Sequence, residues 1–567
     1  MIDHFNRNSV GENNKKAELH STATHGAMYF YTVLRNAVWL LKKNNKIDVV
    51  EIYFHPVVVL SPVALLSPNA LKRIAGSVEE KWSFIKSKLN YLLKTPAVGP
   101  ASKNKESKSD SLYKKIFELG NSCSIKTANG ELSLFPAKKK LIKSLRVMLA
   151  NDWVAIKLWL GLYVAGKLDA RRLLQLKYEG VLIGDLIAST SLRSYPESGG
   201  SLHKSRGLLS LIARSVALVD YCKNHLSIVD NNDVYVTIPE PTYLQAIYRR
   251  SLHSFGANIL ETHHYNGYKK IIESSKVLTN PAIVQNPGLK IRNVNREKSI
   301  AYLNSRIEKP SESLWYMYNG VNRSDELLFD LNGVEVRIQG DQLYAVVFLH
   351  SFDDGQYYFG LDGFDDLYEW TTETIDQLLE NKNVNTIFVK RHPNLNYSRC
   401  PGDLVAFQRL TKRYKQRERV VWLGKDVSPK AFVNSGKFFG ITHHGSVAEE
   451  LVFLGVPVIA GTCAPWGSAY KFVHTWRSPT EYREMLKSFS LDVWSRPSDY
   501  MRNDLYRFVQ EYRIDTLPVE EKTSWMIFAK LIDYNKPAVT PDNYNFYVKM
   551  LEELSSDSKI FHQFMEI

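Results

Sequence analysis

The chain has 567 residues, of which 44% are apolar and 23% are charged, an ordinary balance for a globular enzyme. This composition excludes global disorder and a fibrous repeat, and it does not indicate an integral membrane protein. At about 150 residues per domain, the length predicts about two to four domains.

The charge balance favours an anionic partner. Lys and Arg number 73 against 59 Asp and Glu, a formal net charge of +14, which suits nucleic acids, anionic membrane surfaces or negatively charged sugars and nucleotides. The 4 cysteines include no Cys-x-x-Cys pair, so we expect neither a disulfide framework nor a zinc cluster. Residues 1–16 are polar and lack the apolar core of a secretory signal, so we expect the cytoplasm of a bacterium-like cell.

The first part of the chain mixes helical, extended and loop patterns. Apolar residues at helical spacing predict a helix over 27–42, and the β-branched run 48–60 predicts a buried parallel strand. The polar, basic tract 99–111 has the composition of a flexible loop. Residues 138–165 combine cations with Leu, Trp and Tyr. They predict either amphipathic helices on an anionic membrane leaflet or helices packed inside a domain.

Strand and helix patterns then alternate. Residues 180–187 and 234–238 have the pattern of short buried strands. The second leads into a predicted helix over 242–255, and a further strand follows Gly256. This strand–helix–strand order is typical of nucleotide-binding units in α/β proteins.

A second alternating series follows a polar helical stretch at 294–322. Its predicted strands are at 344–350, 385–393, 420–424, 437–445 and 456–461, and its predicted helices are at 367–381, 402–414 and 446–454. We therefore expect an α/β fold with two lobes and a site in the cleft between them. The first lobe is expected at 1–325, the second at 326–510 and a helical tail at 511–567.

The strongest chemical motif is the run THHGSVAEE at 442–450. A strand that ends in a Gly-Ser turn before a helix exposes backbone N–H groups to an anion such as a nucleotide phosphate. Glu450 lies one turn into that helix, where a carboxylate can accept hydrogen bonds from ribose hydroxyls. Alternatively, Ser446 only caps the helix and the glutamates form a solvated face. The order of elements favours nucleotide binding, and the candidate residues are His443, His444, Gly445, Ser446, Glu450 and Gly461.

A second motif, Lys390-Arg391-His392-Pro393, ends the predicted strand at 385–393. Ligands of open α/β sheets bind at the carboxyl ends of strands, and three potential cations meet there. A phosphate or carboxylate is the expected partner. A surface loop explains this motif equally well in isolation, but its place one unit before the His-His-Gly-Ser turn favours donor binding.

Three polar residues, His350, Asp353 and Asp354, follow the predicted strand at 344–350, where we expect the space between the lobes. Two neighbouring aspartates suggest a metal, but no further ligands follow at regular spacing, so no metal site is predicted. Arg193, in the first half of the chain, is expected to face the same space.

A carboxylate of the first half, Asp185, follows Gly184 between apolar residues. Burial of a carboxyl group tends to raise its pKa. Such an aspartate can act as a nucleophile or base on a sugar carbon, or it can simply cap the next helix. Glu240 also ends a predicted strand and competes for the same catalytic role.

Several of these segments resemble the nucleotide-binding lobe of bacterial surface-polysaccharide (capsule and O-antigen) glycosyltransferases of GT-B fold. The resemblance covers about residues 344–508, through HSFDD, FDDLYEW, VKRHPNLNY, ITHHGSVAEELVFLGVPVIAG and SPTEYREML. In the first half, YEGVLIGDLIASTSLR resembles a further segment of that family, whereas residues 60–150 match nothing. The family's usual Gly-Thr turn is replaced here by His444-Gly445-Ser446.

The group is similar to capsule synthesis proteins and retaining β-Kdo transferases. The resemblance implies two Rossmann-like lobes around a cleft, with Asp185 as the nucleophile and His392 at the donor phosphate. It implies transfer of Kdo or another ulosonic acid from a CMP-sugar to a surface glycan of O-antigen, capsule or lipopolysaccharide, with retention and without a metal or other cofactor.

The partners implied are a nucleotide-sugar donor and a glycan or lipid-linked glycan acceptor, met at the inner face of the inner membrane. One alternative is an enzyme of the same fold that uses a UDP- or GDP-sugar. An alternative of another class is a basic protein that binds membrane surfaces or nucleic acid without catalysis. The chain shows no RRM, KH or helix-turn-helix signature, so nucleic acid is not the expected partner.

Overall fold

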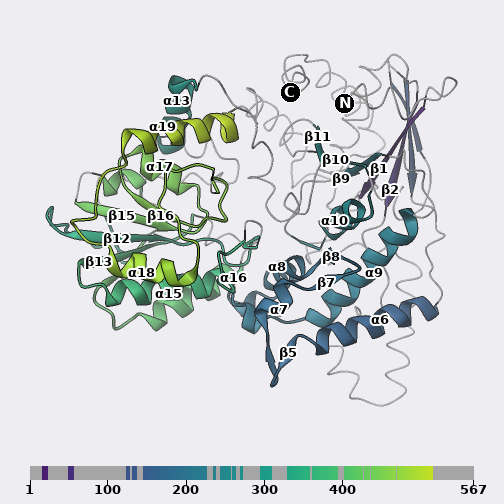
Figure 1. Cartoon of the computed structure of the whole chain (residues 1–567), viewed down its shortest axis with the longest axis horizontal. Helices are drawn as coiled ribbons and strands as arrows, with labels where there is room; N and C mark the ends of the chain where they lie inside the picture. Colours follow the sequence, from purple (N-terminus) through teal and green to yellow (C-terminus); the bar gives the residue numbers. More distant parts are fainter. Residues whose placement is uncertain are drawn as a thin grey trace.

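The computed structural model describes part of the chain, in two α/β regions with helices between them (Figure 1). The described residues are 16–22, 49–55, 123–127, 130–136, 145–226, 234–237, 243–244, 246–256, 258–262, 268–271, 294–308, 328–357, 360–393, 401–424, 427–433, 436–467 and 469–514. The predicted helix at 27–42, the loop at 99–111, Glu240 and residues 515–567 of the predicted tail lie outside them.

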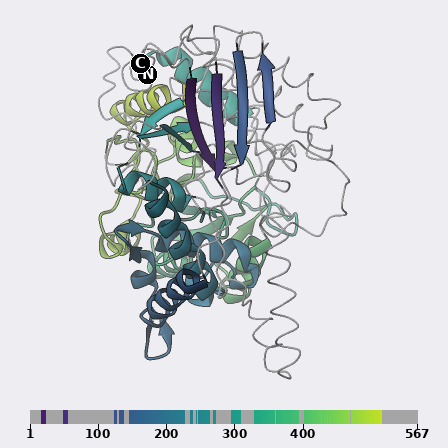
Figure 2. The same cartoon turned by 90° about the vertical axis from the view of Figure 1, so that its right-hand side faces the viewer.

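The first sheet has seven strands in the order β11-β10-β9-β1-β2-β4-β3 (Figure 2). Its central strands pair in parallel, and β11 and β3 add antiparallel edges. Their bounds are β1 Lys16–Thr22, β2 Val49–His55, β3 Cys123–Thr127, β4 Gly130–Pro136, β9 Val234–Thr237, β10 Asn258–Thr262 and β11 Tyr268–Ile271. Strands β2 and β9 confirm the predictions at 48–60 and 234–238.

The predicted strand–helix–strand unit is confirmed as well. Strand β9 leads through α10, Ala246–Ser254, into β10. The two strands pair in parallel from Asn258↔Val234 to Glu261↔Thr237. A parallel pair needs such a crossover, because its second strand must start at the same end of the sheet as the first.

Between β4 and β9, residues 145–226 form a mainly helical region. Helix α9 packs against α6, α8 and α10. The bounds in this region are α6 Leu145–Leu160, α7 Ala170–Leu174, α8 Gly184–Ser194 and α9 Leu208–Leu226, with the hairpin strands β5 Tyr163–Val164 and β6 Lys167–Leu168 after α6. Because α6 packs on α9, the inner side of this part of the predicted 138–165 segment belongs to a packed domain, and residues 138–144 lie outside the described residues.

The predicted strand at 180–187 is wrong. Only Val181–Leu182 is extended, as β8, and α8 begins two residues later at Gly184. The absence of a side chain at Gly184 lets the helix start against α7, where a Cβ would come within 1.7 Å of the Leu173 carbonyl oxygen. A short apolar run does not by itself distinguish a strand from a buried helix.

The second sheet has five strands, all parallel, in the order β14-β13-β12-β15-β16. Every residue of β12, the central strand, is buried, as expected for a strand covered on both faces. The strands are β12 Leu343–Phe348, β13 Val384–Lys390, β14 Val420–Leu423, β15 Lys437–Thr442 and β16 Val458–Ala460; the helices are α13 Arg296–Glu308, α15 Leu367–Glu380, α16 Pro401–Arg413, α17 Val447–Phe453, α18 Pro479–Ser488 and α19 Asp499–Phe508. The five strands with α15, α16 and α17 confirm the predicted second α/β series. Helix α13, which lies within the predicted first lobe, packs against α17 and α19.

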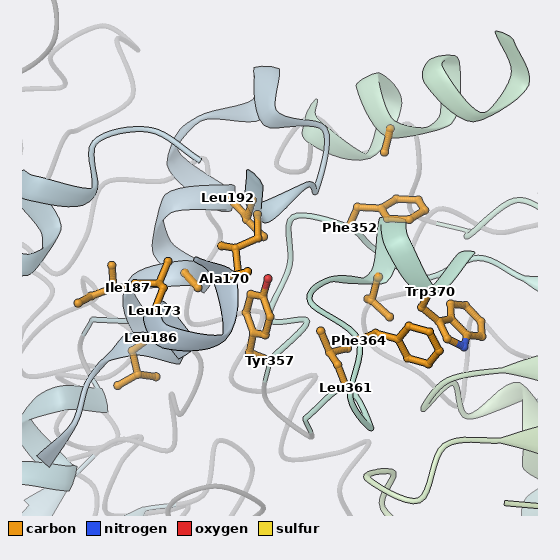
Figure 3. Close-up of a cluster of buried hydrophobic side chains, with 14 of the residues drawn as sticks. Ala170, Leu173, Leu186, Ile187, Leu192, Phe352, Tyr357, Leu361, Phe364 and Trp370 are labelled. Atoms are coloured by element: carbon orange, nitrogen blue, oxygen red, sulfur yellow. The ribbon is translucent and has the colours of Figure 1, made fainter. Parts of the chain in front are cut away.

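The helical region of the first half contacts the second sheet's loops through a shared hydrophobic cluster (Figure 3). Ile187 and Leu192 of α8 lie in this cluster with Tyr357 from the segment that follows β12. A buried hydrogen bond from the Leu202 backbone N–H to Asp366 Oδ2 (2.7 Å) adds to the junction. In the part of the chain that the structure describes, no helix is both long and apolar enough to cross a bilayer.

Candidate functional site

The second sheet changes direction at its central strand. From β12 the chain moves outward through β13 and β14, then returns to the other side of β12 for β15 and β16. The crevice at such a reversal, outside the carboxyl ends of the strands, is where open α/β sheets bind ligands. The loops at this edge carry predicted residues of both main motifs: His350 after β12, His392 after β13 and the His443–Ser446 turn after β15.

Four histidines meet at this edge. The rings of His350 and His444 lie 4.4 Å apart between centroids, and the Nδ1 atoms of His443 and His444 are 3.2 Å apart. His392 is close enough that its charge lowers the pKa of both His350 and His444. Histidines of the two predicted motifs, KRHP at 390–393 and THHGSVAEE at 442–450, therefore form one cluster.

The hydrogen bonds of the buried His350 fix its tautomer. Its Nε2 accepts the backbone N–H of His443 at 3.0 Å and lies 3.0 Å from the Thr442 hydroxyl. That hydroxyl also accepts the Gly445 N–H at 3.2 Å. The proton of the neutral imidazole is therefore assigned to Nδ1 of His350.

These histidines are neutral at pH 7. Burial, followed by the charges of neighbouring histidines, holds the pKa of His350 and His444 well below the usual range. Burial and the Lys390 ammonium lower the pKa of His392 to about 4. The expectation that His392 adds a cation to the KRHP motif is therefore wrong at neutral pH, because desolvation disfavours the charged imidazole. Lys390 and Arg391 remain the cations of that motif.

Asp362 is a residue that sequence reasoning missed. Its Oδ2 lies 3.4 Å from Nε2 of the fully buried His443, and its carboxylate accepts the Cys463 N–H at 3.0 Å. Gly461 lies beside this contact, where a Cβ would come within 2.5 Å of Asp362 Oδ2. Gly461, predicted as a nucleotide contact, thus leaves room for the Asp362–His443 pair.

The Ser446–Glu450 turn is organised by arginines. Arg306 of α13, 1% exposed, donates to Ser446 Oγ and Glu450 Oε1, both at 2.8 Å. Arg306 and Arg513 also contact the Glu449 carboxylate, at 3.2 and 2.6 Å respectively. Ser446 makes no side-chain cap, and the glutamates are buried, so the capping and solvated-face alternatives are both wrong. A ribose role for Glu450 remains a prediction.

Asp185 lies in the first turn of α8, where Arg250 of α10 holds it. The guanidinium donates to both carboxylate oxygens, at 2.6 and 2.7 Å, and also to the Leu182 carbonyl. The residue before the helix is Ile183, and Asp185 therefore does not cap it. Glu240, the competing carboxylate, lies outside the described residues.

The predicted interlobe residues lie where α8 meets the loop after β12. Arg193 Nη1 is 3.6 Å from Asp353 Oδ1 and 3.7 Å from Asp354 Oδ1. Sequence reasoning missed Asp403 of α16, which accepts the backbone N–H of Phe352 and of Asp353. Burial and the adjacent Asp353 raise the pKa of Asp403 to about 8, so one of the two carboxyls holds a proton at neutral pH.

A metal is not built into these groups as far as the described residues go. Among them, no set of three or more His, Cys, Asp or Glu side chains is arranged to hold a metal ion. Independence from metals stays a prediction.

No family model and no curated protein matches the chain. Several solved structures are similar at 8–10% identity. A trehalose-6-phosphate synthase from Burkholderia multivorans covers 95% of this chain and 100% of its own, with a TM-score of 0.27. The β-Kdo 2,4 transferase KpsC from Thermosulfurimonas dismutans covers 48% and 78%, with a TM-score of 0.28.

A UDP-forming trehalose-phosphate synthase from Burkholderia xenovorans covers 92% of this chain and 99% of its own, with a TM-score of 0.29. TM-scores this low carry no conclusion about the site or its substrate. The α/β class rests on the two sheets themselves, and the second of them has its polar residues gathered at the point where the strand order reverses.

Proposed function

We propose that the chain is a glycosyltransferase of GT-B fold that binds a nucleotide-sugar at the carboxyl edge of the second sheet. The observation that carries this proposal is the convergence of His350, His392 and His444 where the strand order reverses at β12. Neutral imidazoles donate and accept hydrogen bonds, and Lys390 beside them supplies positive charge. Together they suit a phosphate ester and the ribose next to it.

The donor in this proposal is a CMP-sugar of Kdo or a related ulosonic acid. Such a donor carries one phosphodiester and one carboxylate, and Lys390 and Arg391 can form ion pairs with these two negative groups. It has no diphosphate that would call for a chelating metal. A donor with UDP or GDP is the alternative, and it would place a second phosphate near the same cations.

Retention in this proposal uses Asp185 as the nucleophile. One carboxylate oxygen bonds to the anomeric carbon while the bond from that carbon to the phosphate oxygen breaks, and CMP leaves with the electron pair. The acceptor hydroxyl then attacks the same carbon, gives up its proton to the phosphate of the departed CMP and releases the Asp185 carboxylate. Arg250 orients the aspartate, and each carboxylate oxygen keeps a second lone pair for the attack.

The acceptor in this proposal is a surface glycan or a lipid-linked glycan, reached at the cytoplasmic face of the inner membrane. The acceptor binds on the side of the first lobe, next to Asp185, while the nucleotide stays on the second sheet.

Calorimetric titration with CMP, UDP, GDP and their sugars tests the proposal. We expect CMP and CMP-Kdo to bind most tightly and His444→Ala to weaken that binding. The control is Tyr500→Ala, a change at an exposed position of α19. Preference for UDP- or GDP-sugars selects the alternative donor. Salt-sensitive binding to generic DNA with no nucleotide binding selects the non-catalytic class.

A further inference from the structure

Helix α6 and the hairpin after it expose large apolar side chains. Leu149, Trp153, Leu160 and Val164 are between 54% and 59% exposed. Scattered exposed apolar residues are ordinary, but these belong to one short segment. We call this set, together with Lys157, the α6 face.

The spacing places the helical members on one side of α6. Leu149 and Trp153 are four residues apart, and Leu160 follows seven after Trp153, so all three lie along one stripe. The opposite side contains the fully buried Ala155 and packs against α9. In Figure 1, α6 runs along the lower edge of the described molecule and the β5 hairpin projects beyond it. The stripe therefore faces outward rather than into the fold.

Cations accompany the stripe, and exposed acidic groups do not. Lys157 lies over the Trp153 ring, with its Nζ 5.3 Å from the centroid. Lys167 is exposed on the hairpin, and Arg172 reaches the end of α6 by donating to the Gly161 carbonyl at 2.7 Å. The one acidic residue in 145–168 is Asp152, which is buried. The composition is that of a helix lying in a membrane interface, with Trp and Leu below the level of Lys and Arg.

We propose that the α6 face docks the protein on an anionic lipid surface. Trp153, Leu160 and Leu149 enter the boundary between headgroups and acyl chains, and Lys157 and Lys167 meet the lipid phosphates. A second copy of the chain is the less fitting occupant, because a two-fold contact would bring the same lysines of both copies together. The role of this docking rests on the proposed function. Docking holds the acceptor-side lobe at the surface where a lipid-linked acceptor lies.

Flotation of the full-length protein with vesicles tests this docking. The vesicles contain phosphatidylcholine alone or phosphatidylcholine and phosphatidylglycerol in comparable amounts. We expect the protein to float with the anionic vesicles at low salt and to detach as salt rises, since screening acts over about 10 Å at 0.1 M. Neutral vesicles should retain little protein.

Two variants and one control separate the contributions. Trp153→Ala combined with Leu160→Ala should lower the bound fraction about tenfold or more, because two large apolar side chains no longer enter the interface. Lys157→Glu combined with Lys167→Glu should abolish the preference for anionic vesicles. Tyr500→Ala, at a position that is 68% exposed on α19, should bind as wild type does. All changes are at exposed positions, and unfolding curves check that the fold persists.

Three outcomes overturn the proposal. They are failure of the wild type to bind anionic vesicles, equal binding by the Trp153/Leu160 variant and the wild type, and a dimer in light scattering that this variant abolishes without any vesicle binding. Nucleotide titration without vesicles tests the proposed function separately, because these variants change no residue of the second sheet. If the wild type binds no nucleotide, the enzyme proposal is wrong, whereas the vesicle measurements still test the docking on lipid.

Discussion

Asp362 Oδ2 lies 3.4 Å from Nε2 of His443, joining the loop before α15 to the turn after β15. On its other side, His443 places Nδ1 at 3.2 Å from Nδ1 of His444. Burial lowers the pKa of His443, while the Asp362 carboxylate raises it. Asp362 thus adjoins the turn that carries His444 in the proposed nucleotide site.

Replacing Asp362 with Ala should weaken nucleotide binding without changing the chemistry of the donor. The change removes the carboxylate beside His443 and the acceptor of the Cys463 N–H, so the turn that carries His444 loses its orientation. We expect a loss of about 1–2 kcal/mol, or roughly 5–30-fold in affinity, by calorimetry. Asp341→Ala, at an exposed position, is the control. Equal affinities for the two variants would contradict the orienting role.

Nucleotide affinity should rise as the pH falls. The pKa of His392 is about 4, and Lys390 and burial keep it low while Asp354 opposes them. A bound phosphate anion raises this pKa, so the complex holds more protons than the free protein between the two pKa values. Binding then takes up protons above about pH 4, and affinity increases as the pH falls toward that value, by at most about tenfold per pH unit for each proton taken up.

Calorimetry in buffers of different ionisation enthalpy measures this uptake directly. His392→Gln should flatten the pH dependence, with the remaining slope due to His350 and His444. A wild-type affinity that does not change as the pH falls, with no proton uptake, would show that the phosphate binds away from His392.

Arg306 should contribute more to stability than any surface arginine of the region around the second sheet. Its guanidinium contacts the carboxylates of Glu449 and Glu450 in a buried site. Removing one partner of a buried ion pair costs about 3–5 kcal/mol, so Arg306→Met should lower the free energy of unfolding by about that amount. Arg502→Met, which breaks a surface pair with Asp499, should change it by less than about 1 kcal/mol. Denaturant unfolding of both variants distinguishes the two cases.

The second sheet was predictable because its strands are continuous apolar runs that end in polar or glycine-containing turns. The predicted helix at 367–381 and the structural α15, Leu367–Glu380, differ by one residue. The strand predicted at 180–187 failed because the same apolar letters also satisfy helical spacing. What decided the local structure there was the contact of Gly184 with Leu173, which no pattern within the run reveals.

The partners of the site residues could not be predicted from the sequence for a different reason. Arg306 lies 144 residues before Glu450, and Asp403 lies 51 residues after Phe352. Their contacts depend on how helices cross the sheet edge, and a single sequence carries no signal for that. The predicted histidines came together because strand order brings the carboxyl ends to one edge. Their neutrality follows from burial, which the sequence did not reveal.

The role of Asp185 as nucleophile gives the most specific prediction of the mechanism. Asp185→Asn keeps the shape of the side chain and removes the attacking charge, so transfer should fall by several orders of magnitude. Donor binding should survive, since the proposed nucleotide contacts belong to the second sheet. Arg250, which is 3% exposed, loses its anionic partner in this variant, so unfolding curves must accompany the activity measurement.

Intact-mass spectrometry of the wild type keeps the test independent of that risk. With donor and no acceptor, the protein should gain the mass of one sugar residue, mapping to the peptide that contains Asp185. Glu240→Gln is the control for the competing carboxylate and should retain both the adduct and transfer. An adduct on Glu240, or near-normal turnover by a folded Asp185→Asn protein, would show that Asp185 is not the nucleophile. Arg250→Lys then separates orientation from attack: a single ammonium cannot hold both carboxylate oxygens, so transfer should slow while the adduct still maps to Asp185.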